Sequence, residues 1–180
     1  MTTATATLTG YDAELLEFLD ERKVRYEVLD GSLVVTPPAN FDHERLVIRI
    51  GGALDAAAPV GITVTGSGYA FHYEPGSFVM ADVTVARTED CRQAGIFVAP
   101  LLVVEILSKS TRHRDLTRKR EIYEQAGVPS YWVVDPDAST LTVLELVEGG
   151  YTEVLVSPLD QPVSVTRPFP LELTVLPAAT

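Results

Sequence analysis

Hydrophobic and polar residues follow two different periods along the chain, and the changes of period divide it into helices and strands. Apolar residues recur every three to four positions in residues 11–21, 40–58 and 115–126, which predicts three amphipathic helices. Either Asn40 or Asp42 can cap the second of these helices. The apolar stripe predicted to be buried on that helix consists of Leu46, Val47, Ile50 and Leu54.

Shorter stretches, rich in β-branched and aromatic residues, predict strands. The hairpin predicted at residues 26–38 has Asp30-Gly31 as its turn and a double proline as its end. Residues 101–107 and 130–135 are apolar on both faces, which is typical of central strands. The other predicted strands are two or three within 61–86, the last at 78–86, and a C-terminal hairpin at 140–146 and 151–157 around Gly149-Gly150.

This order of hairpin, helix, strands, helix, strand and hairpin predicts one α/β or α+β domain, with helices packed on a central mixed sheet. The 180 residues, 46% of them hydrophobic and 22% charged, are enough to bury a sizeable core in one domain. We expect a flexible tail at residues 1–10 and a single domain at residues 11–180.

Glu105 interrupts an otherwise unbroken apolar run, and a buried carboxylate without a partner costs several kcal/mol. Side chains alternate along a strand, so Glu105 shares a face with Val103 and Leu107. Asp82 is a second acid in a mostly apolar stretch. Two unrelated acids would explain Asp82 alone. If the two strands are neighbours, however, both carboxylates can converge on a divalent cation such as Mg²⁺.

The helix predicted at 115–126 carries a lysine on its apolar side. At about 100° per residue, Lys119 lies near the centre of that side, and Asp115 lies one turn earlier on the same face. The ammonium group could extend to the rim of the sheet. Alternatively, it points toward the two carboxylates, where it can orient a water molecule or neutralise a phosphate.

The net charge of -11 argues against indiscriminate binding to nucleic acid. Six of the fourteen basic residues nevertheless gather between Lys109 and Arg120, which is consistent either with a solvated helix face or with a phosphate-binding patch. No apolar run approaches the roughly 18 residues of a membrane helix. The single Cys91 fits a reducing cytoplasm and, with three histidines, makes a zinc site improbable.

One segment, "APLLVVEILSKSTRHRDLTRKREIYEQAGVPSYWVVDP", together with "MADVTVA", "PPANFDHERL" and "YEVLDGSL", resembles the Uma-type restriction endonuclease family of the PD-(D/E)XK nuclease superfamily. The resemblance covers roughly residues 11–145 and implies a restriction-endonuclease-like core. It also implies that Asp82, Glu105 and the backbone carbonyl of Ile106 bind the metal, Mg²⁺ or Mn²⁺. Where the superfamily usually has its lysine, this chain has Leu107, and Lys119 takes the lysine role.

The chain differs from the family pattern at two positions, and several further residues could belong to the site. Ala81 replaces the proline that usually precedes the first acid, and Lys109 could compete with Lys119 for the lysine role. His43 is either a structural or a catalytic histidine, and Glu44 is a possible further metal ligand. Further expected supporting residues are Ser108 and Asp115, and the expected nucleic-acid contacts are Lys109, Arg112 and Arg114.

The resulting hypothesis is a metal-dependent phosphodiester hydrolase, a cytoplasmic DNA endonuclease in which Asp82, Glu105 and Lys119 are catalytic. Cutting two strands, together with the habit of the family, suggests a homodimer. Two alternatives stay open at this point. One is a non-cleaving, nucleic-acid-associated or regulatory binding module on the same fold, and the other is an enzyme acting on a small phosphorylated substrate.

Overall fold

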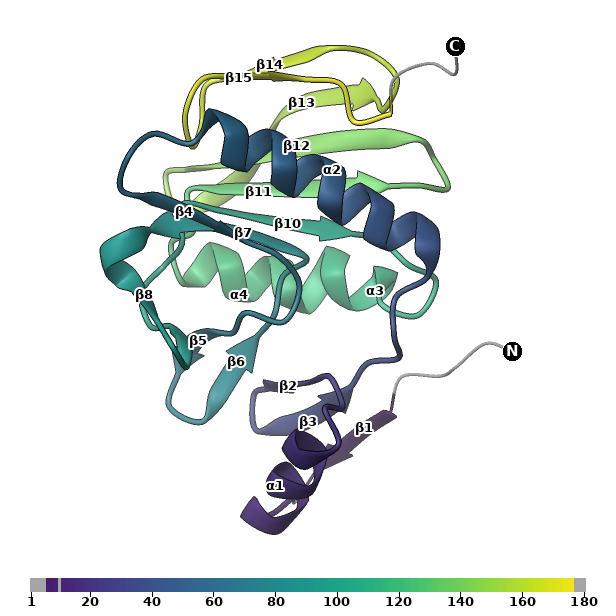
Figure 1. Cartoon of the computed structure of the whole chain (residues 1–180), viewed down its shortest axis with the longest axis vertical. Coiled ribbons are helices and arrows are strands. Elements are labelled where there is room, and N and C mark those ends of the chain that lie inside the picture. Colours follow the sequence, from purple (N-terminus) through teal and green to yellow (C-terminus); the bar gives the residue numbers. More distant parts are fainter. Residues whose placement is uncertain (1–5, 10, 177–180) are drawn as a thin grey trace.

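A six-stranded mixed sheet lies at the centre of the molecule (Figure 1). The computed structural model describes residues 6–9 and 11–176. The strand order is β13-β12-β11-β10-β7-β4, and within this sheet only β10 and β11 pair in parallel. The strands are β4 (Ile62–Thr65), β7 (Val83–Arg87), β10 (Leu102–Ile106), β11 (Ser130–Asp135), β12 (Thr140–Val147) and β13 (Gly150–Pro158).

Every residue of β10 and β11 is buried, which confirms the prediction of two central strands that are covered on both faces. Parallel neighbours need a crossover, and the helical segment between these two strands supplies it. The predicted hairpin β12–β13 is also confirmed. A further hairpin, β14 (Val163–Val165) with β15 (Leu171–Leu173), was not predicted, and it adds apolar side chains to the core.

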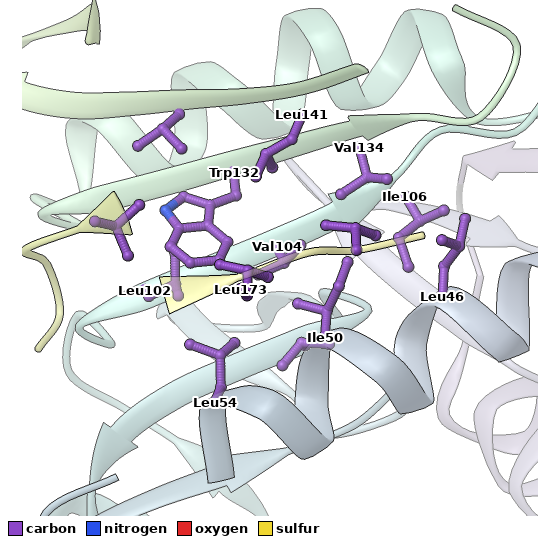
Figure 2. Packing of buried hydrophobic residues seen from close by; sticks show 14 of the residues in the cluster. Leu46, Ile50, Leu54, Leu102, Val104, Ile106, Trp132, Val134, Leu141 and Leu173 are labelled. Carbon is purple, nitrogen blue, oxygen red and sulfur yellow. The ribbon is translucent and has the colours of Figure 1, made fainter. Parts of the chain in front are cut away.

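Helix α2 (Phe41–Ala57) lies across one face of the central sheet (Figure 1). The side chain of Asn40 accepts a hydrogen bond from the N–H of His43 at 2.9 Å, so Asn40 rather than Asp42 is the cap. The four residues of the predicted stripe are buried, and they pack on alternate residues of β10 and on Trp132 (Figure 2).

The second long helix covers the opposite face of the sheet (Figure 1). It begins at Arg112 rather than at residue 115: α3 (Arg112–Arg114) leads into a π-helical segment, η2 (Asp115–Lys119), and then α4 (Arg120–Gln125). The predicted start was wrong because α3 carries no buried residue and therefore shows no apolar period. A π-helical turn inside a helix is often found at a functional site.

The second sheet has seven strands in the order β1-β3-β2-β6-β5-β9-β8. The β2–β3 hairpin is confirmed, and both turn residues, Asp30 and Gly31, have the positive φ expected of such a turn. The elements are β1 (Ala6–Thr9), α1 (Ala13–Glu21), β2 (Tyr26–Leu29), β3 (Ser32–Val35), β5 (Phe71–Glu74), β6 (Ser77–Val79), β8 (Cys91–Arg92) and β9 (Gly95–Ile96), with a short 3₁₀ turn, η1 (Thr88–Asp90).

Strand β1 lies within the stretch that we expected to be a tail, whereas residues 1–5 and 10 of that stretch lie outside the described residues. The single strand predicted at 78–86 is wrong. β6 ends at Val79 and β7 begins at Val83 in the other sheet, so residues 61–86 hold four strands. The sequence pattern hides this break because Met80 and Ala81 are buried as well. As a result, Asp82 lies where the chain passes from one sheet to the other.

Candidate active site

A cavity of about 250 Å³ opens between the two sheets, near the beginning of α2. It brings together the two predicted acids, Asp82 and Glu105, and Lys119. Side chains from both sheets and from α2 and α3 complete the wall; the polar ones are Arg25, Glu27, Thr36, Asn40, His43, Ser108, Lys109, Ser110, Thr111, Arg114 and Asp115.

Asp82 is fixed by the pairing of β7 with β10, which makes the two acid-bearing segments neighbours. Its N–H donates to the carbonyl of Val104 at 3.1 Å, and its Oδ2 accepts from the N–H of Ile106 at 2.8 Å. Oδ1 lies 3.1 Å from Nε2 of His43 and 3.5 Å from Nη2 of Arg25. Burial alone would raise the pKa of Asp82, but the contacts with His43 and Ile106 outweigh it and hold the pKa below its ordinary value.

Glu105 is 2% exposed and is held by two donors. Its Oε1 accepts from Nζ of Lys119 at 3.0 Å and from the hydroxyl of Tyr123 at 2.7 Å. Burial raises the pKa of Glu105 to about 8, and the nearby carboxylates, such as that of Asp115, add to this rise. The positive charge of Lys119 offsets only part of it.

Lys119 is 3% exposed, so its ammonium group does not extend to the rim of the sheet. Besides Glu105, its Nζ contacts Oε1 of Glu27 at 2.8 Å, Oδ1 of Asp115 at 3.8 Å and the carbonyl of Met80 at 3.2 Å. Burial would lower the pKa of Lys119, but Glu105 and Glu27 outweigh this effect and raise it. The ammonium group therefore remains charged. Arg118, the next residue back, points away and pairs with Asp30.

Glu27 is a member of the site that sequence reasoning missed. It comes from β2 in the other sheet, is 2% exposed, and accepts from the N–H of Met80 at 2.7 Å. Arg25, two residues earlier, was also missed. The available signal was an acid between Tyr26 and Val28 in a predicted strand, but nothing in the local pattern shows that this strand reaches Lys119.

The cavity holds four buried carboxylates, those of Glu27, Asp82, Glu105 and Asp115, around one buried ammonium. Oδ1 of Asp115 has no hydrogen-bond partner in the described part of the chain. Among residues 6–9 and 11–176, no three His, Cys, Asp or Glu side chains lie close enough together to hold a metal by themselves. Mg²⁺, however, is usually bound by one or two carboxylates with water and substrate phosphates. This excess of hard, negative oxygen donors therefore fits such an ion.

The remaining predicted residues lie at different distances from this centre. The hydroxyl of Ser108 contacts those of Ser110 and Thr111 at 3.1 and 2.9 Å on the cavity wall, and exposed Lys109 lines it too. Glu44 is exposed and lines a neighbouring cleft rather than this cavity.

The two arginines of the predicted nucleic-acid contacts differ. Arg114 is half-buried, lines the cavity and lies 3.8 Å from Oε2 of Glu27. Arg112 does not line the cavity, and its Nη2 donates to Oδ2 of Asp135 at 2.5 Å. Only Arg114 of this pair therefore faces the carboxylates.

The fold is similar to that of a solved protein from Anabaena variabilis ATCC 29413, described as "a putative nuclease belonging to DUF820". The two chains are 18% identical over 84% of this chain and 88% of that one, with a TM-score of 0.66. No curated protein is similar enough to this chain to count as a match. None of the helices in the described part of the chain is both long and apolar enough to cross a membrane. A family model described as "Putative restriction endonuclease" matches residues 12–179, and the chain therefore belongs to the Uma2 family.

Proposed function

We propose that this protein is a metal-dependent phosphodiesterase that cleaves DNA. The observation that carries the proposal is the single buried lysine among four buried carboxylates, all facing one cavity, in a chain of this family. A buried group of charges reduces stability, and such groups are found most often at functional sites. Hydrolysis of a phosphodiester needs what these groups offer: oxygen ligands for a cation and a fixed positive charge for a phosphate.

Asp82 and Glu105 would hold the cation, together with the backbone carbonyl of Ile106. The N–H of Ile106 points to Asp82, and the N–H and C=O of one strand residue point toward the same neighbour, which favours this carbonyl as a ligand. When bound, the cation would lower the pKa of a water ligand and stabilise charge on the phosphate.

The other residues of the chain would position the reacting groups. Lys119, fixed by Glu105 and Glu27, presents a permanent positive charge that can orient a water molecule or bind a phosphate oxygen. Tyr123 keeps Glu105 in one orientation through its 2.7 Å hydrogen bond. His43 does the same for Asp82 through its contact with Oδ1. His43 is accordingly a positioning residue in this proposal rather than a proton donor.

Calorimetry with Mg²⁺ and Mn²⁺, followed by cleavage assays on plasmid and single-stranded DNA, tests the proposal. Glu105→Ala and Asp82→Ala should each abolish metal binding and cleavage. Asp55→Ala is the matched control, because Asp55 is an exposed acid near the C-terminal end of α2, outside the cavity, and should leave both unchanged. Unaltered metal affinity in both cavity variants would show that these acids are not the ligands.

A binding module that cleaves nothing is the second candidate. It is favoured by the lack of three convergent ligands in the described part of the chain and by the net charge of -11. This reading predicts DNA binding without any dependence on Mg²⁺ and no strand breaks at any metal concentration. The same calorimetry and plasmid assay therefore separate the two candidates.

A further inference from the structure

A second cleft, of about 520 Å³, lies next to the catalytic cavity. Arg25, Pro38 and Ala39 line both, so the two spaces share one wall. The cleft runs between the α1–β2 segment and the segment that leaves β6. Asp82, Glu105 and Lys119 do not line it, whereas Glu44, which the resemblance suggested as a possible further metal ligand, does.

Met80 joins the two spaces physically. Its N–H donates to Glu27, and its carbonyl accepts from both Lys119 and Arg25, each at 3.2 Å. Its side chain lines the second cleft. The same residue therefore anchors the charged centre through its backbone and forms part of the wall of the cleft.

The wall of the catalytic cavity carries donors that make no hydrogen bond with the described residues, and one of them, Nε of Arg25, belongs to the wall shared with the second cleft. Nε of Arg25, Nε and Nη2 of Arg114 and the hydroxyl of Thr36 are buried and make no hydrogen bond with the described residues. Buried donors in this state are costly, and ordered water or a bound group can satisfy them. Arginine N–H groups match phosphate oxygens, so a phosphate between Arg25 and Arg114 would satisfy them.

The second cleft has the walls that a nucleobase needs. The half-buried rings of Tyr26 and Phe78 meet edge to face with their centroids 5.7 Å apart, next to the side chain of Met80. The polar residues that also line this cleft are Asp20, Lys23, Glu44 and Ser67. A flat ring with polar edges is bound in this way in proteins, by stacking on aromatic side chains with a few polar contacts.

We propose that the second cleft is a nucleoside subsite, which binds the base of an unpaired nucleotide whose phosphate lies between Arg25 and Arg114. The inference rests on the proposed function and names its substrate more closely. A base inside a duplex is stacked and paired, so only a single-stranded or flipped-out nucleotide can enter the cleft. The preferred substrate is therefore DNA with unpaired nucleotides at the site of cleavage.

Two short oligonucleotides test the subsite: an oligothymidylate, and a strand with the same phosphates but no bases. Their affinities are measured by fluorescence anisotropy with Ca²⁺ in place of Mg²⁺. The wild-type protein should bind the strand with bases about tenfold more tightly, the order of effect of one stacked base. Phe78→Leu and Tyr26→Leu should remove most of that preference and leave affinity for the abasic strand unchanged, which also shows that the variants are folded.

Phe18→Leu is the matched control, because Phe18 is an aromatic residue of the same region, 47% exposed and outside both spaces. It should keep the full preference for bases. Equal binding of the two strands by the wild-type protein, or an undiminished preference in both cleft variants, would overturn the subsite. If plasmid is still cleaved with Mg²⁺ in that case, the nuclease proposal stands. If the protein binds neither strand and cleaves nothing, both proposals fall.

Discussion

Successive residues of β10 point to two faces of the central sheet, and the chemistry of these faces differs. On the side of α2, Leu102, Val104 and Ile106 are fully buried among aliphatic side chains and Trp132 (Figure 2). On the side of α4, Glu105 lies between Val103 and Leu107 and meets charged and hydroxyl groups. One strand of five residues thus separates a dry core from a charged site.

The two faces of the sheet contribute differently to stability and to function. Burying ions costs several kcal/mol per ion, and their mutual attraction rarely returns all of it. The α2 face carries no such cost and contributes free energy through packing alone. On the α4 face each tyrosine hydroxyl has a partner: that of Tyr131 donates to the carbonyl of Asp115 at 2.9 Å, and that of Tyr123 to Glu105. The charged site is therefore ordered by hydrogen bonds, and burial on the α2 face supplies stability that offsets the cost of its buried charges.

Removing the buried ammonium group should have the largest effect. Lys119→Met leaves four carboxylates without their only fully buried cation, so we expect a loss of about 3–5 kcal/mol in the free energy of unfolding. Cleavage should fall by roughly 10²-fold or more, the scale of losing one preorganised charge-stabilising group. Urea unfolding and a plasmid assay at saturating Mg²⁺ measure the two effects.

Arg118→Met serves as the control for this variant. Arg118 is the adjacent residue, but its guanidinium pairs with Asp30 and Glu121 outside the cavity. It should change turnover little. Because Lys109 also lines the cavity, Lys109→Met is needed as well. If Lys109→Met loses cleavage and a folded Lys119→Met keeps it in full, Lys109 rather than Lys119 is the catalytic lysine.

A cavity on the α2 face should reduce stability without changing the site. Leu54 is 0% exposed, and Leu54→Ala should cost about 2–5 kcal/mol, since the core relaxes only partly around the lost methyl groups. Metal affinity, measured by calorimetry well below the unfolding temperature, should be unchanged. Ile48→Ala, on the same helix but 71% exposed, should stay within about 0.5 kcal/mol of the wild type. Weaker metal binding in Leu54→Ala would contradict the independence of the two faces.

The two arginines near the charged face should respond differently to salt. If Arg114 contacts one phosphate, Arg114→Ala should reduce the log–log slope of DNA affinity against salt by about 0.9. Arg112 is already paired with Asp135 away from the cavity, so Arg112→Ala should leave the slope nearly unchanged. Titrations at several salt concentrations measure both slopes. Equal changes in the two variants would indicate a diffuse basic patch instead of a defined phosphate contact.

The smallest effect concerns pH and the ion pair at the end of β11. The Arg112 guanidinium holds the pKa of Asp135 below its usual value of 3.8, so this pair stabilises the protein above that pH. The contribution is lost as the pH falls through the lower pKa of the folded protein. In acid denaturation below about pH 4, Asp135→Asn should therefore lose less stability than the wild type. An identical pH dependence of both proteins would mean that the pair contributes nothing.

The sequence alone was sufficient to predict the pieces of the charged face that depend on local periodicity. Alternation placed Glu105 on the face of Val103 and Leu107, and helical periodicity placed Lys119 on the inner side of its helix; both are buried there. The same reasoning was wrong at residues 78–86. Met80 and Ala81 continue the apolar pattern through the break between β6 and β7. The alternation of side chains does not show that these two strands pair in different sheets.

Periodicity tells which side of an element faces inward because it follows from the backbone geometry of that element alone. It does not tell which distant segment arrives opposite that side. The sequence by itself thus determined that an acid and a lysine lie on the inward-facing sides of their elements. Only the tertiary structure decided that Glu27 of β2, and Arg25 just before that strand, complete the site. It also decided that a cleft adjoins the site. These contacts depend on long-range pairing, which no local pattern encodes.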